Sequence, residues 1–363
     1  MRALLLLLAG CNASPCEPTT LAPGGDVLRG LAFGDGVETA ISPDGTLACA
    51  TCGELFTLAP GAARPSGHAL PGYVRYYSTA WTAGTDADVY FAASRDSGMT
   101  YALDHDTLDG AELWSVAVAR PDLIRTTQDV VYVYSGDSTT AYSAADGSLR
   151  WQMDGVYYPD GTGGVIETSY GGSAASEPVI ALDAALVQRW TKTLTASSTT
   201  PAAASVAVEP PVVTASGQLV VWGALTGTSL DLGDATLTAT TGTFVAALDR
   251  TSGATSWTYA LPAAYTVTVA GDDVLLWRDL LQPFHGVEVT ILDSTGAART
   301  DTLAIDVPYT AQSSTATVLG SSDQTFWVAL DLYCDADAST VDISVGSQHY
   351  HGSDRLYVFN IAL

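Results

Sequence analysis

Basic residues are scarce in this sequence. Its 363 residues include 14 Lys and Arg, of which only Lys192 is a Lys, against 39 Asp and Glu, so the formal net charge is −25. A protein of that charge repels phosphate backbones and anionic lipid heads, so we expect no nucleic-acid partner. Lys192 does not follow a glycine-rich loop, which excludes a phosphate-binding loop ending in Gly-Lys. We expect a solvated acidic surface, with calcium binding by Asp-rich loops as the alternative.

Helix-forming runs of Leu, Lys and Glu are also missing, and charged residues make up only 15% of the chain. Hydrophobic residues make up 47%, which is enough for a core and argues against intrinsic disorder. Gly, Thr, Ser, Ala and Val are frequent, a balance typical of strands and turns. We therefore predict an all-β protein.

The one unbroken apolar run lies at the N-terminus. Arg2 precedes a Leu-rich segment that stops at Leu8-Ala9-Gly10-Cys11. This is an export signal rather than a membrane span, which needs about 20 apolar residues. The last four residues resemble the bacterial lipobox, in which the Cys is acylated and becomes the new N-terminus. An ordinary signal peptide is the alternative.

This signal sets the expected domain boundaries. We predict a lipoprotein signal peptide over residues 1–10, a flexible Pro/Thr/Ser-rich tether over 11–25 and a single domain over 26–363. The protein is expected to be exported and held at the outer membrane, on its periplasmic or cell-surface face, through the lipid on Cys11 alone.

Four further cysteines remain, an even number in an exported chain, so disulfides are plausible. A β-turn through residues 50–51 would bring Cys49 within reach of Cys52, which would leave Cys16 for Cys334. Without a second such pair, the Cys-x-x-Cys spacing does not indicate a zinc site.

Trp-ended repeats recur along the chain. Each has an apolar strand ending in Asp or its equivalent, a turn with Gly or a small residue, and then a Trp. In such a unit the Asp side chain accepts a hydrogen bond from a backbone N–H that follows it, and the Gly supplies a positive φ. The Trp covers the gap to the next unit. The pairs are Asp104 with Trp114, Asp146 with Trp151, Asp183 with Trp190, and Asp249 with Trp257; a fifth copy, at Asp293, lacks the Trp.

The spacing of these repeats predicts a β-propeller. Successive Trp residues are 37, 39 and 67 residues apart, so the first two spacings fit one four-stranded antiparallel blade each. The third fits a blade with a long insertion or more than one unit. We expect seven blades, with eight as the alternative. Other strands are predicted at residues 46–58, 88–93, 130–134, 218–222, 274–277 and 325–332.

Two sets of repeats resemble known families. Tyr101-Ala102-Leu103-Asp104…Trp114 and Ala247-Leu248-Asp249-Arg250-Thr251-Ser252-Gly253-Ala254-Thr255-Ser256-Trp257 resemble repeats of the pyrroloquinoline-quinone-dehydrogenase-like propellers, which include the outer-membrane assembly lipoprotein of the barrel-insertion machinery. Residues 221–249, and without the final Trp residues 328–363, are similar to a repeat of secreted and cell-surface bacterial propellers. Both resemblances imply a propeller.

No catalytic constellation is found, so we expect no enzyme and no cofactor. There is no Gly-x-Ser-x-Gly elbow, and the Trp residues are explained by the repeats rather than by a quinone site. His349-Tyr350-His351 could place two imidazoles on one strand face, but two ligands are too few for a metal site. The acidic run 335–342 lacks the central Gly and terminal Glu of an EF-hand loop.

These observations favour a non-catalytic protein-binding or scaffolding module of the bacterial envelope. Its partner would be another envelope protein or a surface glycan; a glycan-binding adhesion propeller is the alternative, and a degenerate quinone-dependent oxidoreductase comes third. Residues 195–211 form a Ser/Thr/Ala/Pro tract with little means of building a core strand. We expect this tract and residues 335–342 to lie in surface loops that contact the partner.

Overall fold

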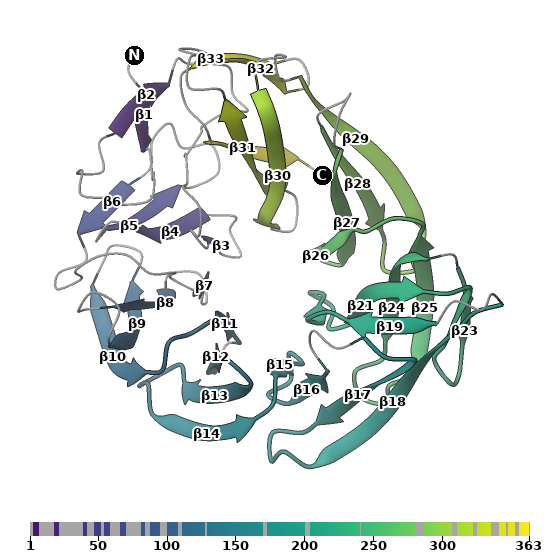
Figure 1. Cartoon of the computed structure of the whole chain (residues 1–363). Coiled ribbons are helices and arrows are strands. Elements are labelled where there is room, and N and C mark those ends of the chain that lie inside the picture. Colours follow the sequence, from purple (N-terminus) through teal and green to yellow (C-terminus); the bar gives the residue numbers. More distant parts are fainter. Residues whose placement is uncertain are drawn as a thin grey trace.

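The chain forms strands joined by turns in the residues that the computed structural model describes. These are residues 100–300 except 108–110, 128, 170–172, 200–203, 240 and 281–285. For residues 279–280 and 286–287, and for the strands elsewhere, only the backbone is described, apart from the side chains of residues 89–92. The strands make antiparallel sheets that follow one another around a ring (Figure 1).

The described strands form seven sheets of three or more strands, besides a hairpin of β1 (Ala3–Leu6) and β2 (Pro18–Leu21). Sheet 1 contains β3 (Thr39–Ile41), β4 (Leu47–Thr51), β5 (Glu54–Leu58) and β6 (Ser66–Ala69). Sheet 2 contains β7 (Trp81–Ala83), β8 (Asp88–Ser94), β9 (Tyr101–Thr107) and β10 (Glu112–Val118). Sheet 3 contains β11 (Leu123–Thr126), β12 (Val130–Ser135), β13 (Ser138–Ser143) and β14 (Leu149–Asp154).

The next two sheets complete the better-described part of the ring. Sheet 4 contains β15 (Tyr157–Pro159), β16 (Val165–Thr168), β17 (Ser176–Leu182), β18 (Gln188–Ser197), β22 (Ser229–Asp231) and β23 (Thr236–Thr238). Sheet 5 contains β19 (Ser205–Val208), β20 (Val212–Val213), β21 (Leu219–Thr226), β24 (Gly242–Leu248) and β25 (Thr255–Leu261).

The C-terminal strands make the last two sheets. Sheet 6 contains β26 (Thr266–Ala270), β27 (Asp273–Leu280), β28 (Gly286–Leu292), β29 (Ala298–Asp306), β32 (Val341–Val345) and β33 (Gln348–Gly352). Sheet 7 contains β30 (Ala311–Ser321), β31 (Thr325–Cys334) and β34 (Leu356–Ala362).

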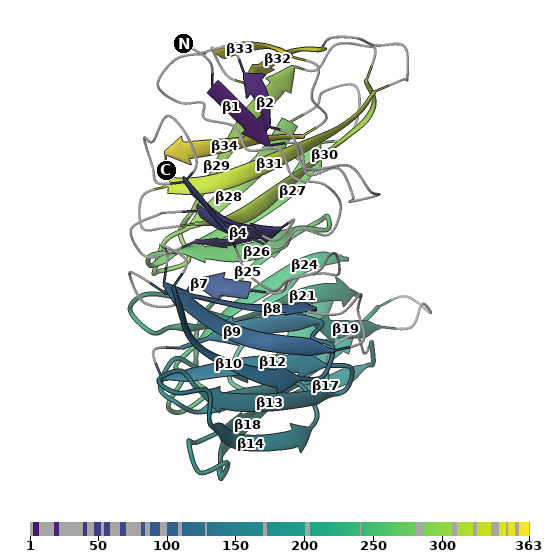
Figure 2. The same ribbon diagram turned by 90° about the vertical axis from the view of Figure 1, so that its left-hand side faces the viewer.

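The first strands of neighbouring sheets contact one another around the ring. β3 contacts β7, β7 contacts β11 and β11 contacts β15; farther on, β20 contacts β26 and β26 contacts β30. The contact of β30 with β3 then closes the ring (Figure 1), and in the side view the sheets lie one above another (Figure 2). This is a β-propeller, and the predicted fold class is confirmed. The seven sheets are counted over the described strands alone, so the number of blades stays a prediction.

The hydrophobic core lies between successive sheets. One cluster joins sheets 2 and 3 around Leu103 and Ile124, and others join sheets 3 and 4, 4 and 5, and 5 and 6. In β18, buried and exposed residues alternate from Trp190 to Leu194, as expected for a strand with one face against a neighbouring sheet. Burial of these faces from water stabilises the stacked sheets.

Two hairpins leave their own sheet and extend the preceding one. β22 and β23 lie between β21 and β24 in the chain, but β22 pairs with β18 of sheet 4, with Ala196 opposite Leu230. β32 and β33 lie between β31 and β34, and β32 pairs with β29 of sheet 6. The first hairpin accounts for the long spacing between Trp190 and Trp257: one sheet with an insertion.

The expectation for residues 195–211 is wrong. Residues 195–197 end β18, where they pair with β22, and Ser205–Val208 is strand β19 of sheet 5. Val206 and Val208 are buried in the core between sheets 4 and 5. These two β-branched valines supply enough apolar surface for β19 to be a core strand. Residues 200–203, in the middle of the tract, lie outside the described residues.

The turn expected between Cys49 and Cys52 is also misplaced. Residues 50–51 belong to β4, and Thr51 pairs with Glu54, so the hairpin turns beyond Thr51. Cys49 therefore lies in an extended strand. The side chains of the four cysteines, together with Cys11, lie outside the described residues, so lipidation and disulfide pairing stay predictions.

Candidate functional site

Three outer-strand tryptophans each bind the turn of the following sheet. The indole Nε1 donates a hydrogen bond to a turn carbonyl, and the ring lies against a turn glycine of positive φ. A Cβ on that glycine would stand 2.8 Å from the ring, so only Gly fits. The contacts are Trp114 with Ala144 O (2.9 Å) and Gly147, Trp190 with Arg250 O (2.9 Å) and Gly253, and Trp257 with Ser294 O (3.1 Å) and Gly296.

A β-bulge precedes the Trp in four sheets. In sheet 5, for example, Leu248 pairs with Thr255 and Ala247 pairs with Trp257, so Ser256 is skipped. The same shift occurs before Trp114, Trp151 and Trp190. Sheet 6, which lacks the Trp, pairs β28 with β29 without a shift. Because a bulge re-aims the side chains beside it, we infer that the bulge directs the Trp toward the next sheet.

Trp151 makes a different junction. The corresponding turn of sheet 4 has Leu186 at φ 60° in place of the glycine, and the Trp151 indole donates no hydrogen bond to a described residue. Its ring instead stands edge-on to Tyr132 at 5.9 Å and Tyr157 at 6.3 Å between centroids. The hydroxyl of Tyr134 donates to Tyr157 O at 2.9 Å. Aromatic packing therefore joins sheets 3 and 4.

The repeat aspartates fall into two groups. Asp183 and Asp249 open their turns and accept N–H groups two residues ahead, from Ala185 at 2.9 Å and Thr251 at 3.1 Å. Hydrogen bonds from Ser252 keep the pKa of Asp249 below its ordinary value.

The other two repeat aspartates, Asp146 and Asp104, do not open their turns as we expected. Asp146 stands next to Gly147 late in its turn, and Ser143 takes the opening position, where its N–H donates to Ser148 O at 2.8 Å. Asp146 still accepts from the N–H of Ser148 at 3.1 Å. Asp104 lies inside β9, fully buried and opposite Ser115, so it starts no turn. β9 continues to Thr107, so the turn between β9 and β10 comes after Asp104.

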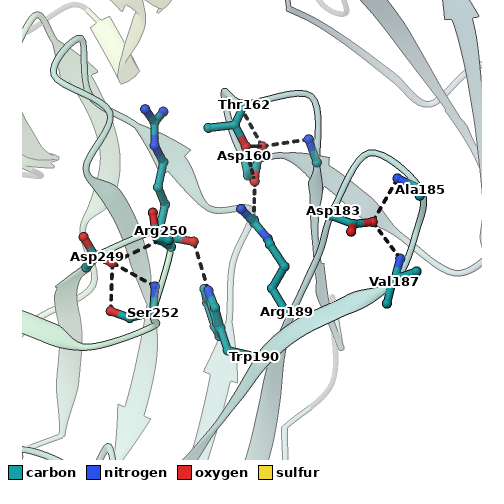
Figure 3. Close-up of polar contacts among 12 residues, drawn as sticks. Asp160, Thr162, Asp183, Ala185, Val187, Arg189, Trp190, Asp249, Arg250 and Ser252 are labelled. Carbon is teal, nitrogen blue, oxygen red and sulfur yellow. Dashed lines mark hydrogen bonds and ion pairs between the residues drawn. The ribbon is translucent and has the colours of Figure 1, made fainter.

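Four turns of sheets 4 and 5 meet in one place, which we name the turn cluster: residues 160–164, 183–187, 214–217 and 249–253 (Figure 3). The fully buried carboxylate of Asp160 forms an ion pair with Arg189 on β18. It also accepts the N–H groups of Thr162 at 2.7 Å and Gly164 at 3.0 Å. A buried charge with this many partners fixes the shape of its turn.

Arg250, in the 249–253 turn, lies against two other turns of the cluster, 160–164 and 214–217. Its backbone carbonyl accepts the Trp190 indole, and its side chain extends past the 160–164 turn (Figure 3). A Cβ at Gly217 would stand 2.6 Å from the guanidinium carbon, and one at Gly161 would stand 3.4 Å from Nη1. Both glycines have positive φ, of 86° and 76°. The guanidinium therefore lies in a gap that two glycines leave open.

Among the described residues, the Arg250 guanidinium has no hydrogen-bond acceptor and no ion pair. By contrast, Arg189 pairs with Asp160 and Arg278 pairs with Glu288. Arg250 is partly exposed, so its N–H donors can reach a ligand from solvent. A planar guanidinium binds carboxylates in a bidentate manner, and the described residues supply no carboxylate to this one.

The only lysine of the chain stabilises the neighbouring junction. Lys192 Nζ donates to Asp234 Oδ1 at 2.5 Å, to Thr255 Oγ1 at 3.0 Å and to Leu232 O at 3.1 Å. These bonds join β18 of sheet 4 to the β22–β23 hairpin and to β25. Burial opposes ionisation of Asp234, but the bonds from Lys192 and Thr255 outweigh it and lower its pKa well below the ordinary value.

The turn cluster could be read only partly from the sequence. Asp183 and Asp249 are repeat residues that lie in two turns of the cluster, and the indole of a third, Trp190, binds the 249–253 turn. Arg250 lies within a repeat but has no distinguishing pattern there, and Asp160, Gly161 and Gly217 lie in turns outside the repeat residues, so the sequence does not predict their contacts. In the part of the chain that the structure describes, no three His, Cys, Asp or Glu residues are grouped to hold a metal. Nor is any helix there long and apolar enough to span a membrane.

No family model and no curated protein sequence matches the chain. Solved structures do resemble it. A chain of a mitotic checkpoint complex is 11% identical with a TM-score of 0.50, covering 97% of this chain and 98% of that one. Hsv2 of Kluyveromyces lactis is 9% identical with a TM-score of 0.50, covering 86% and 97%. BamB from Moraxella catarrhalis is 14% identical with a TM-score of 0.45, covering 94% and 99%. At these identities, the two structures with a TM-score of 0.50 show the β-propeller fold alone.

Proposed function

We propose that this protein is a non-catalytic protein-binding module of the bacterial envelope, and that the turn cluster contacts the partner. The observation that carries the proposal is the Arg250 guanidinium, held between Gly161 and Gly217 with no acceptor among the described residues. A charged group whose position is fixed before binding loses little conformational freedom when it meets a ligand. An Asp or Glu side chain of a protein partner would supply the missing acceptor.

The test compares three variants in recovery of cross-linked partners from native membranes. Arg250→Ala removes the donors, and Gly217→Ala keeps the charge but displaces the guanidinium. Arg120→Ala removes an exposed Arg just beyond β10 and is the matched control. We expect a specific partner to be lost from the first two variants and kept by the control. Equal recovery from all variants would refute the assignment of the site.

The same experiment distinguishes the glycan-binding alternative. If the recovered material is glycan, and soluble oligosaccharide displaces it from the wild-type protein and from Arg250→Ala alike, the binding surface is elsewhere on the ring and the protein is an adhesion propeller. No described contact favours a glycan over a carboxylate at Arg250.

The location is part of the proposal. We infer that the protein is exported and anchored to the outer membrane by a lipid on Cys11, because the only long apolar run ends at the lipobox-like residues 8–11. Cys11→Ser should release the protein into the soluble fraction. A variant that still sediments with membranes after a high-salt wash would contradict the lipid anchor.

A further inference from the structure

The outer edges of sheets 4, 5 and 6 differ in whether another strand covers them. β18 of sheet 4 is covered by β22, and β29 of sheet 6 is covered by β32. Each covering hairpin is inserted between the second and third strands of the next sheet. The corresponding connection for sheet 5, residues 281–285 between β27 and β28, is too short to supply two strands. β25 therefore ends sheet 5 on the outside of the ring, with no described strand beyond it (Figure 1).

β25 also carries nothing that would prevent another strand from pairing with it. Its sequence, Thr-Ser-Trp-Thr-Tyr-Ala-Leu, contains no charged residue and no proline, the residues that protect many edge strands. The uncovered outer strands of sheets 2 and 3 do carry charges, at Glu112 in β10 and at Arg150 and Asp154 in β14. Of the outer strands in sheets 2–6, β25 is thus the one that is both uncovered and uncharged.

The open part of this edge has a defined length. At the start of β25, the N–H of Thr255 donates to Asp234 Oδ2 at 2.8 Å, in the turn of the β22–β23 hairpin. Beyond it, residues 256–260 form no backbone hydrogen bond outside sheet 5 with any described residue. Alternate N–H and C=O groups of an edge strand point away from its sheet, so this stretch can pair with an incoming strand. Thr258 is its midpoint.

An antiparallel copy of β25 matches this stretch. With a two-fold axis at Thr258, Trp257 of each copy lies opposite Tyr259 of the other, so an aromatic pair forms twice. Both rings lie on the face that packs against the core between sheets 5 and 6. Thr258 lies opposite itself, and Ser256 lies opposite Ala260. Aromatic and Thr–Thr pairs stabilise antiparallel strands, and no like charges meet. A two-fold pair also closes both edges at once, so it does not grow into a fibre.

The net charge of the molecule opposes this association at long range. Two copies with a formal charge of −25 each repel one another. At physiological salt, exposed charges farther apart than about 8 Å are largely screened, and the paired strands themselves are neutral. Added salt should therefore strengthen the pairing of two copies, whereas it would weaken the binding of a basic partner.

We propose that β25 pairs with β25 of a second copy of this chain, antiparallel about Thr258, so that the protein forms a two-fold homodimer through sheet 5. The two copies of sheet 5 then make one continuous sheet across the interface. This surface is separate from the Arg250 guanidinium, and the pairing does not rest on the proposed function.

Sedimentation equilibrium of the full-length protein at about 0.15 M and about 1 M NaCl measures the association, because the Debye length falls from about 8 Å to about 3 Å. We expect a monomer–dimer equilibrium that shifts toward the dimer at the higher salt. Thr258→Lys places two ammonium groups opposite each other on the axis and should abolish the dimer. Thr193→Lys makes the same change at an exposed residue of β18, whose edge β22 covers, and should dimerise like the wild type. Circular dichroism checks that each variant is folded.

Disulfide trapping tests the register independently of the Lys variants. Residues directly opposite in an antiparallel pair have Cα atoms about 4.5–5.5 Å apart, within disulfide reach. On mild oxidation, Thr258→Cys should give cross-linked dimers above the level of the wild type, which reports any cross-link through the five native cysteines. Ser256→Cys and Ala260→Cys should not cross-link alone, since each lies about 13 Å from its own copy, but should do so when mixed.

Three results would overturn the proposal. A protein that stays monomeric at every concentration and at both salt levels would leave the edge to a strand of another protein. A dimer in which Thr258→Cys cross-links no more than the wild type has its interface elsewhere. A dimer that folded Thr258→Lys leaves intact counts against the pairing equally.

Discussion

Replacing Trp190 by Ala tests whether the Trp–turn contact holds neighbouring blades together. Trp190 is 8% exposed, its ring lies against Gly253, and its indole donates to Arg250 O. Truncating a buried aromatic residue costs about 3–5 kcal/mol. Loss of the indole hydrogen bond accounts for about 1 kcal/mol of this. In a protein of this size each kcal/mol lowers Tm by roughly 2 °C, so Tm should fall by about 6–10 °C.

The assay is thermal and urea unfolding followed by circular dichroism. Trp190→Phe keeps an aromatic ring and loses the donor, so it should fall between wild type and Trp190→Ala. Trp151→Ala is the comparison: it loses ring packing but no hydrogen bond to a described residue, and should be less destabilising than Trp190→Ala. A Trp190→Ala protein that unfolds at the wild-type midpoint would refute the reasoning and suggest that these tryptophans face a ligand.

Three further predictions follow from single contacts. Gly253→Ala should destabilise by about 1–2 kcal/mol from its φ of 71° alone, and more because the methyl group meets Trp190; urea midpoints measure it, and no change would contradict the strained turn. Asp234→Ala should cost about 1–3 kcal/mol, since it leaves the buried Lys192 ammonium with fewer acceptors, and Asp234→Asn should recover part of the loss. Burial raises the pKa of Tyr132 to about 12, so the unfolded chain loses this proton first and the free energy of unfolding should fall from pH 10 to 12; Tyr132→Phe should flatten that slope.

The sequence predicted the fold because its signals are local and repeated. Strands at residues 88–93, 130–134 and 274–277 are present as β8, β12 and β27, where β-branched and aromatic residues meet turn residues at both ends. The region 46–58 is the β4–β5 hairpin. Propeller closure follows from such repeats, since each unit covers its neighbour.

The remaining features depend on contacts between distant parts of the chain. Asp104 follows the same Ala-Leu pair as Asp249, yet it lies inside β9. The length of β9 is set by its pairing with β8 and β10. The gap that holds Arg250 is made by Gly161 and Gly217, from two other turns. Neither can be inferred from the residues beside them.

The β22–β23 hairpin also constrains the order in which the chain can reach its final form. β18 ends at Ser197, but the strand that covers its outer edge begins at Ser229, within the next repeat. Because the chain is synthesised from its N-terminus, β18 of sheet 4 has an unpaired edge until β19, β20 and β21 of sheet 5 and then β22 have been made. An open edge can pair with another chain, so a pause or truncation between residues 197 and 229 should favour aggregation.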